Sequence, residues 1–404
     1  MNILFLSRWF PYPADNGSKI RVFNLLRQLS KHHTVDLVSF ATEDVTTESV
    51  DELRCYCRSV VFTSYRPYQP HRLKGILGLF SPRPRSVIDT YDKEMQHLVI
   101  QTFKENHPQL VIASQIDMAA YVLPLQGVAK IIEEVELASL YEQSSNAATS
   151  AQRLRPTLMW RKWVNYMHHL LLQFNGCTVV SSREREILEG FIFPQNQRNG
   201  IPPVQIIPNG VALEDYRRGD YDAPIPDTLI FSGALTYLAN LDAVTFFIRD
   251  IFSEIRQNHP SVELAITGST EGVSLEGLIN QPGVTFLGHL DDIRPAVARS
   301  WASVVPLRLG GGTRYKILES LAIGTPVVAT RKGAEGLELK DGHDFLLANS
   351  ASDFAAQTLR LLDDTLLRES HSANGKQTIT EYYDWDKIGA RLCEFVEQLV
   401  TKKD

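Results

Sequence analysis

Residues 308–328 read RLGGGTRYKILESLAIGTPVV, which joins a glycine-rich turn to an amphipathic segment with opposite charges. The apolar run ASVVPL at 302–307 precedes this stretch, and a Gly-Thr-Pro turn leads from it into a second β-branched run. The order of strand, glycine turn, helix and strand is typical of α/β proteins with a parallel sheet. We therefore expect the stretch to lie at the carboxyl end of a strand, where such proteins bind ligands.

The glycines and cations of this stretch predict a site for an anion. Gly311 and Gly312 lack side chains, so backbone amides there can approach a ligand closely, and Thr313 is expected to cap the following helix. Arg314 and Lys316 fall in the first helical turn, where the helix dipole opposes a cation unless an anion is bound nearby. We expect these two cations to neutralise a diphosphate.

Glu319 follows Lys316 by three residues, so the two side chains share one face of the predicted helix, about 5 Å apart. A nucleotide's ribose and distal phosphate have a similar separation. An ionised carboxylate only accepts hydrogen bonds, and Glu319 is expected to bind both ribose hydroxyls. The alternative is a glycine turn followed by a solvated Lys–Glu pair. The patterns GxxxxGK[ST] and GxGxxG do not match, which disfavours a P-loop kinase and an ordinary NAD-dependent enzyme.

Short apolar runs alternate with helical segments along the whole chain, and they form two series. A polar segment with two prolines, residues 214–227, separates the series and is predicted to be a linker. With 404 residues the chain has room for both domains, an N-terminal one at 1–213 and a C-terminal one at 228–384. The predicted strands are 2–7, 34–40, 110–114, 130–135, 177–182 and 204–207, then 228–233, 263–268, 284–288, 302–307, 326–330 and 345–348.

Composition excludes several classes of protein. A net charge of −6 and a pI near 6.0 argue against a general nucleic-acid binder. Four cysteines without a CxxC pair indicate neither a disulfide framework nor a zinc site, and they fit a reducing cytoplasm. The apolar N-terminus reads as a strand, and no run of apolar residues is long enough to span a membrane.

The second half resembles the donor-binding domain of retaining GT-B glycosyltransferases of family four, also called group 1. The resemblance implies an α/β fold of two Rossmann-like domains whose parallel sheets face each other across a cleft, with a closing helix at about 385–404 that packs back on the first domain. It also implies transfer of a sugar from a UDP- or GDP-sugar to a hydroxyl acceptor with retention of configuration, in cell-surface polysaccharide or glycolipid synthesis. The acceptor would be a carbohydrate, a lipid-linked sugar or a small molecule. The matching stretches are 179–182, 207–211, 231–233, 265–268, 284–290, 316–319 and 324–328.

The family's motifs place a set of positions at the donor, and this sequence departs from them twice. The family spaces two glutamates eight residues apart, whereas here Gly311 stands at the first position and Glu319 at the second. Residues 233–240 also lack the Arg and Lys that many members carry there, so that Arg308, Arg314 and Lys316 would supply the positive charge. The expected donor contacts are Gly17, Asn209, Gly233, Asn240, Gly268, His289, Leu290, Arg308, Gly311, Gly312, Thr313 and Glu319. For Gly17 the alternative is a plain turn before a helix.

Two features of the first half point to an acceptor site and a surface role. Glu133, Glu134 and Glu136 follow a strand, and one of them, with Glu134 as our candidate, is expected to orient the acceptor hydroxyl or the sugar; the alternative is a solvated loop. Residues 65–85 and 153–163 are basic and interleaved with apolar side chains, which suits an anionic membrane surface at the inner face of the membrane or a lipid-phosphate acceptor. The alternative there is a solvated loop and an ordinary amphipathic helix.

No cofactor or metal is expected. The DxD strings at 220–222 and 384–386 do not follow apolar strands, and Asp384 is better interpreted as a helix cap. No GxSxG pattern occurs, so catalysis is expected to rest on electrostatic stabilisation of the leaving diphosphate by Lys316 and Arg314. Rival functions are a nucleotide-sugar epimerase of similar layout and a non-catalytic nucleotide-sugar binding protein.

Overall fold

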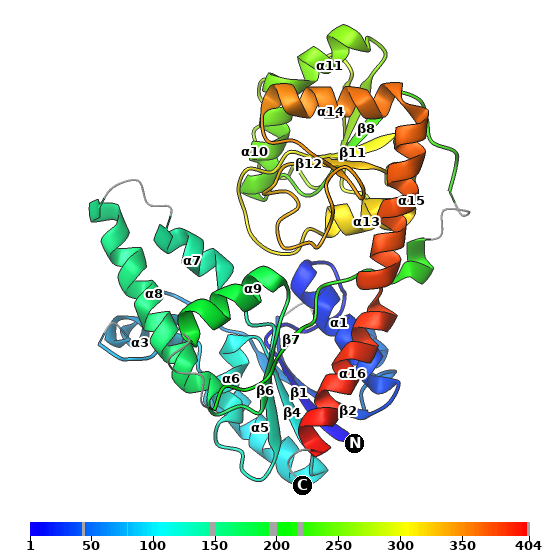
Figure 1. The fold of residues 1–404 in the computed structure, drawn as a ribbon. Coiled ribbons are helices and arrows are strands. Elements are labelled where there is room, and N and C mark those ends of the chain that lie inside the picture. The colour runs from blue at the N-terminus through cyan, green and yellow to red at the C-terminus, as the bar shows by residue number, and fades with distance from the viewer. Residues whose placement is uncertain (43–44, 79, 146–149, 194–199, 217–220, 402–404) are drawn as a thin grey trace. The chain divides into compact units, whose positions relative to one another are not determined.

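The computed structural model describes residues 1–42, 45–78, 80–145, 150–193, 200–216 and 221–401. The chain divides into two compact units. Unit 1 comprises Met1–Pro208 and Ile388–Asp404, and unit 2 comprises Asn209–Lys387. Each unit is a parallel sheet with helices around it (Figure 1). The predicted α/β fold of two Rossmann-like domains is therefore confirmed.

The described residues of unit 1 form a seven-stranded parallel sheet in the order β3-β2-β1-β4-β5-β6-β7. Its central strands β1 and β4 are almost entirely buried and mostly aliphatic, as strands covered by helices on both faces require. β3 was missed from the sequence because its apolar run, residues 60–62, is only three residues long, and a single residue of the strand is buried. The strands are β1 (Asn2–Ser7), β2 (Thr34–Ala41), β3 (Ser59–Ser64), β4 (Leu110–Ser114), β5 (Ala129–Glu133), β6 (Gly176–Val179) and β7 (Val204–Ile206).

Helices follow most of these strands. The C-terminal helix α16 (Trp385–Thr401) belongs to unit 1 from Ile388 onward and lies so close to β6 that a Cβ on Gly176 would meet Leu399 Cδ1 at 2.5 Å. The other helices are α1 (Gly17–Ser30), α2 (Thr47–Arg54), α3 (Leu73–Leu77), α4 (Arg85–Asp89), α5 (Lys93–Asn106), α6 (Ile116–Val122), α7 (Ala138–Ser145), α8 (Ser150–Leu171), α9 (Ser182–Ile187) and the π-helical turn η1 (Leu188–Ile192).

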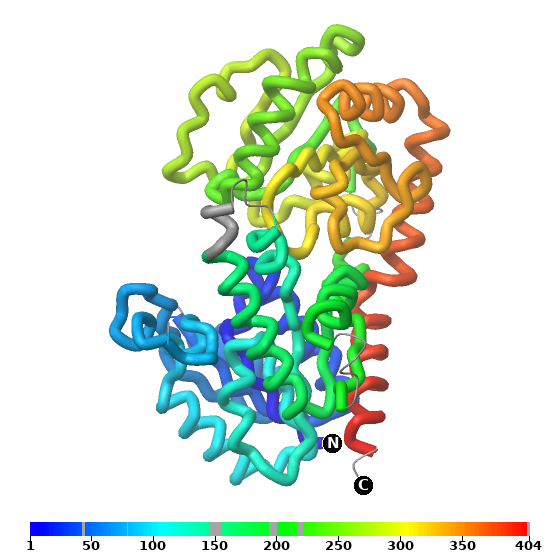
Figure 2. The backbone as a smooth tube through the Cα atoms, turned by 60° about the vertical axis from the view of Figure 1, so that its left-hand side comes forward, coloured from blue at the N-terminus to red at the C-terminus, as the bar shows by residue number. Residues whose placement is uncertain are grey.

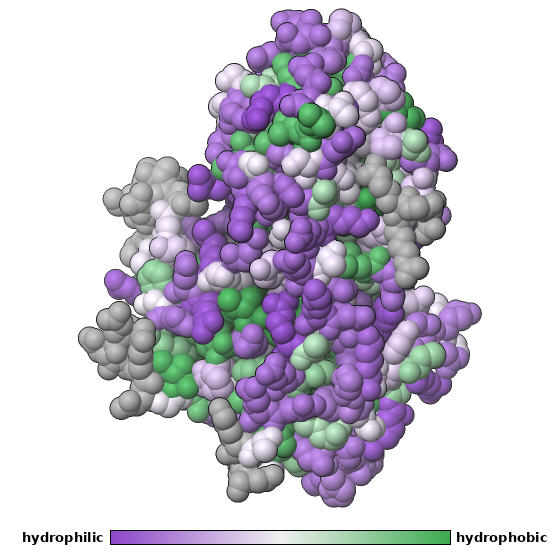
Figure 3. All heavy atoms as spheres, turned by 45° about the vertical axis from the view of Figure 1, so that its right-hand side comes forward, coloured by the Kyte–Doolittle hydropathy of each residue, from purple (hydrophilic) through white to green (hydrophobic). Residues whose placement is uncertain are grey.

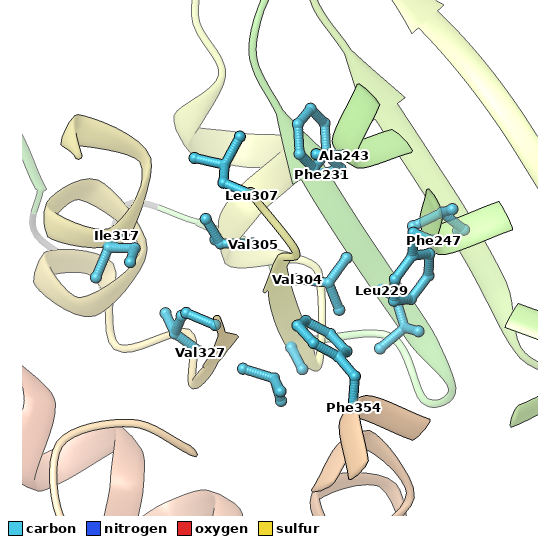
Figure 4. Packing of buried hydrophobic residues seen from close by; sticks show 14 of the residues in the cluster. Leu229, Phe231, Ala243, Phe247, Val304, Val305, Leu307, Ile317, Val327 and Phe354 are labelled. Atoms are coloured by element: carbon cyan, nitrogen blue, oxygen red, sulfur yellow. The ribbon is translucent and has the colours of Figure 1, made fainter. Parts of the chain in front are cut away.

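Within its described residues, unit 2 repeats the same strand order with six parallel strands, β10-β9-β8-β11-β12-β13. Figure 4 shows its core, where side chains of the strands meet Phe247 and Phe354, whose rings pack edge to face at 5.7 Å. The strands are β8 (Thr228–Ser232), β9 (Glu263–Thr267), β10 (Val284–Gly288), β11 (Ala302–Val305), β12 (Val327–Ala329) and β13 (Leu346–Leu347).

The region predicted to be a linker contributes to unit 2. Leu213–Tyr216 forms a 3-10 turn, and the amide of Ile225 donates to the carbonyl of Arg299 at 2.8 Å. Residues 217–220, including Asp220 of the first DxD string, lie outside the described residues. The helices of unit 2 are α10 (Leu238–Phe246), the π-helical turn η5 (Phe247–Ile251), α11 (Phe252–Asn258), α12 (Arg294–Ala298), α13 (Tyr315–Ile323), α14 (Ala351–Asp363) and α15 (Thr365–Tyr382).

Hydrophilic residues cover most of the face drawn in Figure 3, with smaller hydrophobic areas among them. None of the helices in the described ranges is both long and apolar enough to cross a membrane. At the start of α16, Asp384 Oδ1 accepts the amide of Asp386 at 3.3 Å, as expected of a helix cap.

Candidate active site

In unit 2, the carboxyl ends of β8, β9, β10 and β11 lie at one edge of the sheet because all these strands are parallel. This edge carries Gly233, Gly268, His289 and the glycine-rich loop at 308–314. Gly233 and Gly268 have φ of 142° and 120°, and a Cβ on Gly268 would lie 2.4 Å from the Gly233 carbonyl. Only glycine permits this close approach of the two strand ends.

Lys316 lies in the first turn of α13, and its ammonium is held by neutral groups. Nζ donates to Asn240 Oδ1 at 2.7 Å and lies 4.3 Å from the centre of the Phe231 ring. Asn240 is itself fixed, because its Nδ2 donates to the carbonyl of Ala234 at 2.8 Å. A Cβ on Gly233 would come within 2.9 Å of Nζ, so glycine also makes room for the ammonium.

Burial and, to a smaller extent, the neighbouring Arg314 cation together lower the pKa of Lys316 to about 7, against the attraction of Glu319. The ammonium therefore lies where its charge is poorly solvated. An anion bound at this position would offset both effects, which is the behaviour expected of a binding site for phosphate.

Glu319, one turn further along α13, has a neutral partner as well. The hydroxyl of Tyr216 donates to its Oε1 at 3.1 Å. Burial raises the pKa of Glu319 to about 7, while Tyr216, Lys316 and Arg294 act in the opposite direction. The structure thus places Lys316 and Glu319 on one helix face, as predicted, and adds Tyr216, which the sequence did not reveal because it lies in the segment interpreted as a linker.

Arg314 has a different position from the one predicted. It stands at the N-cap of α13 rather than in its first turn, and its buried guanidinium donates to the carbonyls of Gly310 at 3.0 Å and Gly311 at 3.3 Å. It also lies 3.6 Å from the Glu335 carboxylate. Arg314 therefore stabilises the conformation of the glycine loop through its backbone carbonyls.

Thr313 does not cap the helix, and this prediction was wrong. The helix begins one residue later than expected, and the Thr313 hydroxyl instead accepts a hydrogen bond from Asn209 Nδ2. The buried Asn209 thereby ties the start of unit 2 to the glycine loop. Gly312 has φ of 83° and is exposed, as is Gly311.

Three further predicted donor residues lie at the same edge: Arg308, His289 and Leu290. Arg308 forms a bidentate pair with Asp242 at 3.0 and 2.6 Å and stacks 4.3 Å from the Phe246 ring centre. The His289 side chain is 74% exposed and lies 3.7 Å from Asp291, and Leu290 follows it, partly buried. Arg308 thus has its own counter-ion in Asp242.

In unit 1, a buried ion pair fills the same edge of the sheet. Arg21 of α1 is fully buried and donates to Glu133 Oε1 through Nε at 2.8 Å and Nη2 at 2.5 Å, and to the carbonyl of Ile207 at 2.9 Å. The Ser114 hydroxyl donates to the other oxygen of Glu133 at 2.9 Å. Glu133 is therefore a structural group. Gly17 is the first residue of α1, behind an Asn16 cap.

Glu134 is buried beside this pair but has a different partner. Gln115 Nε2 donates to its Oε2 at 2.9 Å, and Arg21 Nε lies 3.7 Å from its Oε1. Burial raises the pKa of Glu134, an effect that Arg21 opposes and Glu133 reinforces. Both Gln115 and Glu134 have positive φ, 70° and 59°. Backbone conformations of this kind are costly for residues other than glycine and occur preferentially at functional sites.

A cavity of about 470 Å³ opens at these residues within unit 1. Gln115 Oε1 is buried there and has no hydrogen-bond partner among the described residues. Arg8 is held by Asp117 at 2.6 Å and by the Tyr65 hydroxyl at 2.7 Å. The sequence contains a signal for this cavity, because a polar residue follows each of three strands: Arg8 after β1, Gln115 after β4 and Glu134 after β5. The sequence analysis used this signal only for the glutamates. Its lining includes Arg8, Trp9, Ser18, Tyr68, Thr90, Gln115, Asp117, Glu134, Glu136 and Trp163.

The described residues contain no group of three His, Cys, Asp or Glu side chains arranged to hold a metal ion. By their chemistry, the carboxylate and amide oxygens described above can accept hydrogen bonds from hydroxyl groups, and the Lys316 ammonium can pair with an anion.

The chain is similar to several known proteins. A family model described as "Glycosyl transferases group 1" matches residues 226–364, which lie within unit 2. Phosphatidyl-myo-inositol mannosyltransferase of Mycobacterium leprae is 28% identical over 206 residues, which are 48% of this chain and 54% of that protein. The match thus spans about half the length of that relative.

Solved structures match over the whole chain. Sucrose-phosphate synthase from Thermosynechococcus elongatus superimposes with a TM-score of 0.67 at 18% identity, covering 100% of both chains. Anabaena HepE in complex with UDP and glucose gives a TM-score of 0.64 at 15% identity, covering 98% of this chain and 100% of HepE. The two parallel-sheet units have the GT-B fold, and the family model supports a group 1 glycosyltransferase.

Proposed function

We propose that the protein transfers a sugar from a nucleotide diphosphate sugar, with UDP or GDP as the nucleotide, to a hydroxyl acceptor with retention of configuration. The observation that carries this proposal is the pair of charges on α13: a half-buried Lys316 and, one turn on, Glu319, each held by a neutral partner. Two charges without a mutual ion pair suit a ligand that brings both an anion and hydroxyl groups. HepE, which has this fold, was solved with UDP and glucose.

In unit 2 the diphosphate would lie against Lys316 and the amides at the start of α13, whose dipole favours an anion. Glu319 would accept hydrogen bonds from the ribose hydroxyls, and the Tyr216 hydroxyl would fix the carboxylate in place. Gly311 and Gly312 would leave the diphosphate open to backbone contact, while Arg314 shapes their loop. Gly268, His289 and Leu290 would border the nucleotide base.

The chemical role of Lys316 follows from the charge that the reaction creates. The bond between the anomeric carbon and the diphosphate oxygen breaks, and both bonding electrons remain on the diphosphate. A preorganised ammonium in a poorly solvated site stabilises this developing charge more than it stabilises the bound substrate. The acceptor hydroxyl bonds to the anomeric carbon, and its proton passes to an oxygen of the departing diphosphate. Retention rests on the resemblance to retaining enzymes.

Unit 1 would bind the acceptor in the cavity at Glu134. Gln115 Oε1 and Glu134 would accept hydrogen bonds from acceptor hydroxyls, and the rings of Trp9, Tyr68 and Trp163 line the same cavity. Aromatic rings beside a few convergent polar groups suit a carbohydrate or lipid-linked sugar. We place the reaction in the cytoplasm, without metal or cofactor, in the synthesis of a cell-surface polysaccharide or glycolipid.

The test is incubation of the purified protein with UDP-glucose or GDP-mannose, with and without a mixture of glycoside acceptors. Nucleotide release that depends on the acceptor, with a product whose anomeric configuration matches the donor by NMR, is the expected result. Conversion of the donor to another sugar without acceptor would instead identify an epimerase. Tight binding of a donor without turnover would identify a nucleotide-sugar binding protein.

A further inference from the structure

The segment around α3 exposes a cluster of large apolar side chains. Leu73, Ile76, Leu77 and Phe80 are 72, 45, 58 and 88% exposed, all within one short segment. Residue 79 in the same segment lies outside the described residues. In Figure 2 this blue segment projects from unit 1 at the left. Single exposed apolar residues are ordinary on a soluble protein, but a contiguous cluster marks an interaction site.

Hydrogen bonds from neighbouring cations hold this segment in shape. Arg85 donates to the carbonyls of Gly75 and Pro70, both at 2.6 Å. Lys162 of α8 donates to the carbonyl of Gly78 at 2.7 Å and so fixes the end of α3. These hydrogen bonds fix the backbone of the segment, and the apolar side chains are exposed on it.

Positive charge surrounds the apolar cluster. Residues 65–85 contain five Arg or Lys and no Asp or Glu, although the whole chain carries a net charge of −6. Arg66, Lys74 and Arg83 are exposed, and Leu158 and Arg161 on α8 extend the same combination of apolar and basic side chains. We name these exposed residues the α3 surface: Leu73, Ile76, Leu77, Phe80, Arg66, Lys74, Arg83, Leu158 and Arg161.

We propose that the α3 surface docks on an anionic lipid bilayer. The net charge of −6 disfavours contact between an anionic membrane and the protein in general, whereas the basic α3 surface attracts such a membrane. Apolar side chains can then enter the boundary between headgroups and acyl chains, where their burial needs no shaped pocket. The inference stands independently of the proposed function, because it rests on residues outside the candidate sites of unit 1 and of unit 2.

The test is flotation with vesicles of phosphatidylcholine, with and without phosphatidylglycerol. We expect the intact protein to bind vesicles that contain phosphatidylglycerol, to bind pure phosphatidylcholine at least about tenfold more weakly, and to lose binding as salt rises toward about 1 M, where the Debye length falls to about 3 Å. Failure to bind the anionic vesicles at low salt overturns the proposal.

Two variants locate the contact. Leu77→Asp combined with Phe80→Asp is expected to weaken vesicle binding by at least about tenfold, and Lys74→Gln by about fivefold. The matched control is Leu366→Asp in unit 2, at a side chain that is 77% exposed, with vesicle binding expected to be unchanged. Because every substituted residue is exposed, thermal melts of the variants are expected to match the parent protein.

Two further results would overturn the proposal. The first is equal vesicle binding by the Leu77→Asp, Phe80→Asp variant and the parent protein. The second is a lipid-free dimer that the same substitutions convert to a monomer in gel filtration, which would assign the α3 surface to a second copy of the chain. Turnover of a soluble acceptor distinguishes these failures from a failure of the proposed function, because that assay contains no membrane.

Discussion

The two units place charged side chains at the same point of the same topology, but they balance these charges differently. In unit 1, Arg21 and Glu133 form a direct ion pair with no exposure at either side chain. In unit 2, Lys316 is held by Asn240 and Glu319 by Tyr216. The charges of unit 1 are thus satisfied by the protein itself, whereas those of unit 2 have neutral partners and remain suited to a charged ligand.

This difference separates structural from functional charges. A balanced buried pair changes little when a ligand binds, and removal of one partner leaves the other charge buried alone. Lys316 contacts an amide oxygen and an aromatic ring, so the binding of an anion beside it would stabilise its charge further. Both clusters lie at the carboxyl ends of strands, near the point where the strand order reverses. This point is between β1 and β4 in unit 1 and between β8 and β11 in unit 2. Position alone therefore does not distinguish the two clusters.

The largest expected effect is on the stability of unit 1. Arg21→Met should reduce the free energy of unfolding by about 3–5 kcal/mol, because Glu133 loses its buried counter-ion and Glu134 a nearby cation. Chemical denaturation measures this loss. The matched control is Arg27→Met on the same helix, whose partly buried guanidinium stacks 5.8 Å from the Phe23 ring centre and should matter by about 1 kcal/mol or less. Equal stability of the two variants would contradict a structural role for the Arg21–Glu133 pair.

In unit 2 the corresponding substitution should affect turnover instead. Lys316→Met removes a cation whose charge burial disfavours, so the melting temperature should stay the same or rise. We expect kcat to fall by about 10²–10³, the range for one lost donor to a developing charge. Lys340→Met, at an exposed lysine of the same unit, is the control. A folded Lys316→Met enzyme with unchanged kcat and a raised KM would restrict Lys316 to substrate binding.

The sequence predicted the fold better than it predicted the role of each charge. Almost entirely buried strands such as β1 and β4 gave a clear apolar signal, whereas the short apolar run of the more exposed β3 was not recognised. The helical spacing of Lys316 and Glu319 was enough to place them on one face. Their partners could not be predicted, because Asn240 and Tyr216 are distant in sequence and approach only in the folded chain. The same reason explains why Arg21 was not recognised as the counter-ion of Glu133.

Glu319→Ala should have a smaller effect, confined to the nucleotide. The lost charge-assisted hydrogen bonds to the ribose should weaken nucleotide binding by about 1.5–3 kcal/mol. Calorimetric titration with UDP and with GDP measures the change, and Glu276→Ala, at an exposed carboxylate of unit 2, serves as the control. Nucleotide affinity equal to that of the parent protein in a folded Glu319→Ala variant would remove Glu319 from the site.

The smallest expected effect is the change in donor affinity per pH unit, which tests whether Lys316 and Glu319 both contact the donor. The folded-state pKa of Lys316 is lowered to about 7 and that of Glu319 is raised to about 7. Donor binding needs Lys316 protonated and Glu319 ionised. The diphosphate of a nucleotide sugar does not titrate near neutral pH, so affinity for UDP-glucose or GDP-mannose, whichever binds, should be greatest near pH 7 and fall on both sides. Above pH 7 the loss approaches tenfold per unit, about 1.4 kcal/mol, until the pH reaches the higher pKa that Lys316 has in the complex. Below pH 7 protonation of Glu319 weakens its carboxyl group as a hydrogen-bond acceptor, so affinity falls there as well.

Two variants separate the two sides of this pH profile. Lys316→Met should abolish the fall in affinity above pH 7 alone, and Glu319→Gln the fall below pH 7 alone. Affinity that is constant from pH 6 to 9 in the parent protein would mean that neither charge meets the donor, and unit 2 would then hold its charges for structure, as unit 1 does.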